Sequence, residues 1–162
     1  MTYVKDLLSD QLLANANDRS WYEPFSVAVA QLSEEHAHWK PNHDVNSIAE
    51  IVQHLLYWNK TWQMRYIAND IHAVPSIGDN NKSFELGDAL PFKEMKATLL
   101  STLLNWQEIL TESQLQERVR GFSEDVHWWQ VIGNLTTHNA YHIGQIITLR
   151  KIQRCWHSHY KW

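Results

Sequence analysis

The chain has 162 residues, of which 44% are hydrophobic, so it can bury one core, and its length predicts a single domain over residues 1–162. Its net charge of −4 comes from 14 basic and 18 acidic residues of interspersed sign, which argues against nucleic-acid binding. No run of about 18 apolar residues predicts a membrane span, and a single cysteine, Cys155, excludes an internal disulfide. We therefore expect a soluble cytoplasmic protein without a membrane or nucleic-acid partner.

Long segments with a helical period predict an all-α protein, because five glycines and four prolines are few and no alternating strand pattern competes. The first segment runs from Val4 to Leu12 and breaks over residues 15–20. Ser20 and Glu23 have the spacing of a capping box, which predicts a second start and a helix to about Ser33. The first helix of the bundle is therefore expected to be broken, and a loop follows at residues 39–43.

Ser47 and Glu50 form a second capping box, which opens a helix with an apolar stripe on one face. His54 lies on the flank of that stripe and is expected to point into the bundle. Roughly twenty residues up to Pro91 then lack periodicity, which exceeds the usual ~2–8 residue link between helices. This segment predicts a long crossover between the second and third helices of a four-helix bundle.

The third helix is predicted over residues 92–110, and the fourth is expected to start near Ser123, followed by acids in its first turn. One face of the fourth helix runs from Trp128 to Ile152 and holds three polar side chains, His138, His142 and Gln145. Burying such groups without partners costs several kcal/mol. The face therefore predicts a ligand for the imidazoles, and a metal ion is the simplest one.

His138 and His142 are four residues apart, so their Cβ atoms lie about 5–6 Å apart on one helix face and both rings can bind one ion. His54 supplies a third nitrogen, and three protein ligands leave a coordination position open. Imidazoles suit several divalent metals; zinc is the first expectation and nickel the second. Gln145 could orient a histidine or a water as an outer-shell group, or it could reach solvent. Each histidine taken alone is more often a buried ring paired with a carbonyl or a tyrosine.

Three segments resemble the signature segments of the DinB-like (damage-inducible) family: residues 21–24, 47–58 and 138–145. The resemblance covers nearly the whole chain. It implies a four-helix bundle in an up-down-down-up arrangement, with a metal held by His54, His138 and His142. It also implies a homodimer and, in some members, transfer of low-molecular-weight thiols such as bacillithiol or mycothiol. Many other members have no established reaction.

The residue after His138 is Asn139, where a zincin metalloprotease would have a glutamate that deprotonates water. We therefore expect a small-molecule substrate, and most of all a transferase in which a small thiol binds the metal as thiolate and attacks an electrophile. The alternatives are a metal-dependent hydrolase of a small substrate, a non-catalytic, stress-associated metal-binding dimer, and a histidine-rich bundle that binds no physiological metal. No residue is assigned as catalytic. Glu50 could approach the site as a base, but its capping role is the stronger expectation.

Two groups near these motifs have a structural and a functional interpretation. The cations at the end of the last helix are expected to face water and complement the helix dipole, or to bind an anionic thiol; they are Arg150, Lys151 and Arg154. The tryptophans Trp58, Trp128 and Trp129 are expected in the core rather than at a substrate.

Overall fold

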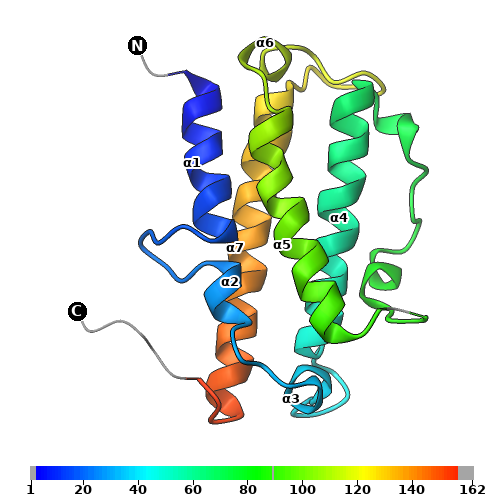
Figure 1. Cartoon of the computed structure of the whole chain (residues 1–162). Helices are drawn as coiled ribbons and strands as arrows, with labels where there is room; N and C mark the ends of the chain where they lie inside the picture. The colour runs from blue at the N-terminus through cyan, green and yellow to red at the C-terminus, as the bar shows by residue number, and fades with distance from the viewer. Residues whose placement is uncertain (1–2, 89, 157–162) are drawn as a thin grey trace.

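The computed structural model describes residues 3–88 and 90–156 as a bundle of four long helices. Helices α1 (Val4–Ala16) and α7 (Trp128–Ile152) run in one direction, and α4 (Ile48–Ala68) and α5 (Phe92–Ile109) run in the other (Figure 1). The described residues form isolated β-bridges but no strand. The predicted all-α bundle and its up-down-down-up arrangement are confirmed.

The core is shared by all four long helices. Helix α4 packs against α5 and α7, and α1 closes the bundle by packing against the same two helices. Phe25 and Phe92 are buried in one apolar cluster, and Trp106 and Trp128 in a second one. Burial of a phenylalanine side chain contributes about 1.5–3 kcal/mol, so apolar contact accounts for much of the stability. In the described part of the chain, no helix is both long and apolar enough to cross a membrane.

The first helix is broken as predicted, but the residue predicted to begin its second part was wrong. The helix expected from Ser20 instead begins after Pro24 as the single turn α2 (Phe25–Ala28). Proline has a fixed φ that suits a helix start, and it lacks the N–H that a helix interior needs. The helix ends at Ala28, Gln31 then adopts a left-handed conformation (φ 55°), and α3 (Glu34–His38) follows separately.

Helix α4 begins where the sequence predicts. The Ser47 hydroxyl accepts a hydrogen bond from the Glu50 N–H at 3.2 Å, and Glu50 Oε2 accepts one from the Ser47 N–H at 2.6 Å. These bonds satisfy two donors that a helix start leaves free. The helix ends at Asn69, which takes the left-handed conformation common at helix ends.

The segment between α4 and α5 returns along the side of the bundle, as predicted for a crossover (Figure 1). It contains two 3₁₀ turns, η1 (Ile71–Ala73) and η2 (Asn80–Phe84), and both pack against α4. The crossover is therefore a wall of the bundle beside α4 and not only a link.

The start of the last helix differs from the prediction. Residues 110–127 contain the short helix α6 (Glu112–Leu115) and a loop, and α7 begins after His127 instead of Ser123. The Val119 N–H donates a hydrogen bond to the Val126 carbonyl at 2.8 Å and closes this loop. Residue 123 therefore lies within the loop and not at the start of a helix. Gly121 has a φ of +91° and lies against η1, where a Cβ atom would come within 2.6 Å of Ile71 Cγ1. At the far end of the helix, Ile152 is 55% exposed although it continues the predicted buried face.

Candidate metal centre

His54 comes from the second turn of α4 and is only 2% exposed. Its Nδ1 atom lies 2.6 Å from the hydroxyl oxygen of Ser83 in η2, and its ring stacks on Phe84 with centroids 3.9 Å apart. The crossover therefore fixes both the plane and the rotation of this imidazole.

His138 and His142 come from adjacent turns of α7 and face α4. His142 is 7% exposed, and His138 is partly buried. The three ring centroids are 4.6–5.0 Å apart, and one ligand atom from each ring lies within 4.8 Å of the other two. The structure thus brings together the three histidines that the sequence singled out, in a group that could hold a metal ion.

Burial keeps these imidazoles neutral. Desolvation, and after it the proximity of His142 and His138, lowers the pKa of His54 to about 3. The pKa of His138 falls to about 4, first through burial and then through His142, and burial also lowers the pKa of His142. Neutral imidazole is the form that binds a metal, so the group is available at neutral pH without losing a proton.

Hydrogen bonds define which ring nitrogen of two histidines faces the centre. The Ser83 hydroxyl donates its proton to the Asn80 carbonyl at 2.5 Å, so its oxygen accepts from His54 Nδ1–H. Gln145 Oε1 accepts from His142 Nδ1–H at 2.7 Å. In both rings the Nε2 lone pair remains available, as in metal sites where an outer partner fixes the tautomer.

The donor set fits a divalent cation. His54 Nε2 and His138 Nε2 are 2.9 Å apart, and two nitrogen lone pairs at this distance repel unless a proton or a cation lies between them. His138 Nδ1 is buried and has no hydrogen-bond partner. Three imidazoles that leave one side open to a pocket have the ligand number of a catalytic zinc site.

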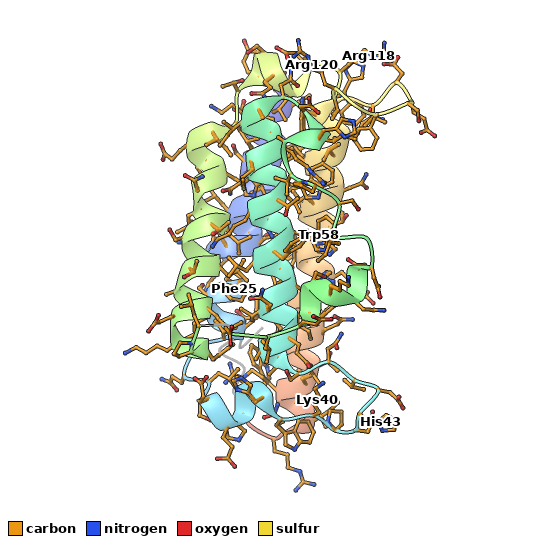
Figure 2. The ribbon with its side chains drawn as sticks, turned by 90° about the vertical axis from the view of Figure 1, so that its right-hand side faces the viewer. Phe25, Lys40, His43, Trp58, Arg118 and Arg120 are labelled. Atoms are coloured by element: carbon orange, nitrogen blue, oxygen red, sulfur yellow. The ribbon has the colours of Figure 1, made fainter. Side chains whose placement is uncertain are left out.

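The open side leads into a pocket of about 670 Å³ between α4, α7, η2 and the loop before α7. Trp58 lies on α4 next to η2 (Figure 2) and lines the pocket, so the expectation that it belongs to the core was wrong. Trp128 is fully buried as expected, whereas Trp129 is 43% exposed. The pocket was not predicted, because residues from the crossover and the loop before α7 complete it.

Two charged residues near the histidine motifs, Glu50 and Arg150, have partners outside the histidine group. Glu50 is held by its cap and by an ion pair with Lys40 at 2.7 Å, and Lys40 lies at the end of the bundle, away from Trp58 (Figure 2). Arg150 is only 5% exposed and donates to the carbonyls of Ala28 and Cys155, both at 2.9 Å. The expectation that Arg150 faces water was wrong, because these carbonyls hold its guanidinium inside the bundle.

Ser83 and Asn80 are site residues that the sequence analysis missed. They lie in a segment without periodicity, and only the packing of η2 against α4 places them beside His54. Gly78 and Asp79, followed by a short polar run, were local signals of a turn there, but not of a contact with His54.

A bundle in which the second and the last long helix direct three neutral imidazoles toward one open pocket defines a four-helix protein with a potential metal centre. The family profile of the DinB superfamily matches residues 16–146, and the chain belongs to this superfamily. A crystal structure of a DinB-like protein (YjoA) from Bacillus subtilis has a similar fold, with a TM-score of 0.69 and 14% identity over 96% of both chains. A search of curated proteins gave no match.

Proposed function

We propose that this protein is a metal-dependent transferase that joins a low-molecular-weight thiol to an electrophilic small molecule. The observation that carries the proposal is the meeting of His54, His138 and His142 on the wall of an open pocket whose described lining contains no carboxylate. Such a site has ligands for a cation but no acidic side chain to serve as a general base.

The three imidazoles would hold the metal through one ring nitrogen each, with zinc as the first expectation and nickel as the second. A bound divalent cation would lower the pKa of a thiol so far that the thiolate, the attacking species, forms without a protein base. Ser83 and Gln145 keep His54 and His142 turned toward the centre. The protein therefore contributes orientation and a pocket.

In the proposed reaction the thiol sulfur forms a bond to an electrophilic carbon of the substrate. The leaving group departs with the electron pair of its bond to that carbon, and the thiol proton passes to solvent. The rings of Trp58 and Phe84 form apolar walls beside His54, which exclude water from that side of the reacting atoms.

Hydrolysis of a small substrate is the closest alternative, and it differs in needing no thiol. Glu50, the carboxylate considered as its base, is held by Ser47 and Lys40 instead. A non-catalytic metal-binding protein is the third possibility, in which the ion serves stability alone.

The test uses tag-free protein analysed for bound metal, loaded with zinc or nickel, and mixed with bacillithiol, mycothiol or glutathione and 1-chloro-2,4-dinitrobenzene. We expect one metal per chain and thiol-dependent release of chloride. His142→Ala should lower metal affinity at least about 100-fold, since loss of an outer partner alone costs about 10–100-fold. The rate of thiol transfer should fall together with the metal affinity.

His43→Ala is the matched control, because this histidine is almost fully exposed in a loop. It should leave metal content and rate unchanged. Rates equal in His142→Ala and the unsubstituted protein would contradict the proposal. Activity on esters without thiol would favour the hydrolase, and a metal-loaded protein without either activity would favour the non-catalytic role.

A further inference from the structure

The pocket beside the three histidines has an uncharged lining, and five of the ten other lining residues are aromatic. Trp58 and Trp62 come from α4, Phe84 from η2, Phe122 from the loop before α7, and Tyr141 from α7. Val126, Val131 and Leu135 add aliphatic surface. Among the described lining residues there is no lysine, arginine, aspartate or glutamate.

From this lining we infer that the pocket binds an electrically neutral, aromatic small molecule, with only its reacting atom reaching the histidine centre. The inference rests on the proposed function, because it names the class of electrophile that such a transferase would take. It concerns the lining itself, however, and can be tested without turnover.

The lack of charged side chains in the described lining favours neutral ligands over ionic ones. Away from the histidine centre, where a bound metal ion would supply the local positive charge, a carboxylate or sulfonate in this pocket would lose water without gaining a cationic partner, which is strongly unfavourable. The neighbouring cation, Arg65, stacks on the Trp62 ring at 4.9 Å, donates to the Val74 carbonyl at 2.9 Å and is not part of the lining. Rings on several sides offer a flat ligand offset-stacked and edge-to-face contacts instead.

Polar contacts in the pocket suit a neutral group. Asn80 Oδ1 accepts from Trp58 Nε1 at 3.0 Å, so the indole N–H that faces the pocket has its partner. Asn134, an exposed residue of α7 that lines the pocket, offers an amide that can bond an uncharged polar substituent. Phe122 and Tyr141 are 40% and 64% exposed, which places them toward the mouth, where they can cover a bound ring.

Two fluorescent dyes with one ring system test the inference: neutral N-phenyl-1-naphthylamine and its sulfonate, 1-anilinonaphthalene-8-sulfonate. Both are titrated into chelator-treated protein, so that no metal ion at the histidine centre attracts the sulfonate. We expect the neutral dye to bind at least about tenfold more tightly. Because Lys93 and Lys96 line a second apolar groove, the sulfonate titration is repeated in a Lys93→Gln/Lys96→Gln variant. Equal or tighter binding of the sulfonate in that variant would overturn the inference.

A matched pair of substitutions on α7 localises the effect. Asn134→Lys adds a cation to the lining and should strengthen sulfonate binding about tenfold, whereas Thr137→Lys adds the same charge at an exposed position outside the lining and should not. Equal gains in both variants would also overturn it. Thiol transfer is assayed separately in metal-loaded protein: its absence there would refute the proposed function, whereas a neutral preference in the dye titrations would leave this inference standing.

Discussion

Two buried polar clusters lie side by side between α4 and α7, and they differ in how completely their hydrogen bonds are made. Asn59 and Asn139 are fully buried, and Asn59 bonds Asn139, the Leu55 carbonyl and Trp106 Nε1 at 2.9–3.2 Å. The neighbouring cluster of His54, His138 and His142 has an unpartnered ring nitrogen and opens into a pocket.

The comparison separates a cluster that completes its own hydrogen bonds from one that could hold a metal ion. Buried polar groups that bond one another fully need nothing more and specify how two helices pack. The histidine cluster leaves a buried ring nitrogen of His138 without a partner and directs three imidazoles to one point, where a metal ion could bind them. The sequence does not tell the two clusters apart, because Asn139 of one directly follows His138 of the other on the same helix.

The largest expected effect is on stability, at the asparagine cluster. Asn59→Ala leaves the Trp106 N–H and the Asn139 amide buried without partners, so the free energy of unfolding should fall by about 2–3 kcal/mol. Urea denaturation measures it. Elemental analysis of the folded variant should still find the metal, whereas His54→Ala should lose it. Metal loss in folded Asn59→Ala would show that the two clusters are not separate.

The second effect is a pH dependence of the metal-free histidine cluster. The unfolded chain has histidine pKa values of about 6.5, above those of about 3 and 4 for His54 and His138 in the folded state. As pH falls below 6.5 the unfolded chain takes up protons first, so stability decreases, and the decrease ends near pH 3. Between pH 7 and 6 we expect a loss of roughly 1.5 kcal/mol from the two histidines together, in chelator-treated protein.

This pH interval lies above the range in which carboxylates take up protons, so it isolates the histidines. The double variant His54→Gln/His138→Gln should lose most of the pH dependence, measured by urea denaturation at both pH values. An unchanged slope in that variant would assign the effect to other groups.

The smallest effect tests the partner of His54. Ser83→Ala removes the acceptor that holds Nδ1–H, and metal affinity should fall about tenfold, measured by competition with a chelating dye. Ser83→Thr keeps the hydroxyl and should restore affinity. Ser76→Ala changes an exposed serine of the same crossover and serves as the control. Equal affinities in Ser83→Ala and Ser76→Ala would mean that the Ser83 bond does not orient the ligand.

The fold could be predicted from the sequence wherever the signal is local. The capping box at Ser47 and the helical periods of α4, α5 and α7 are properties of neighbouring residues, and so is the spacing of His138 and His142. These features sufficed for the bundle and for the histidine group.

The remaining features depend on contacts between distant residues. Ser83 reaches His54 only because η2 packs on α4, and the start of α7 moved to Trp128 because the loop before it forms its own backbone bonds. Arg150 was placed in water because its carbonyl partners lie outside α7. The hydrophobic periodicity of a single helix does not predict such contacts between segments that are distant in the sequence.

Gly121 has a consequence for any attempt to change what the pocket accepts. It lines no part of the pocket, yet a side chain there would collide with Ile71 and His72 and push the loop off η1. Phe122, the next residue, would move with it. A library that varies only the walls of the cavity would therefore miss a position whose substitution should displace one of those walls.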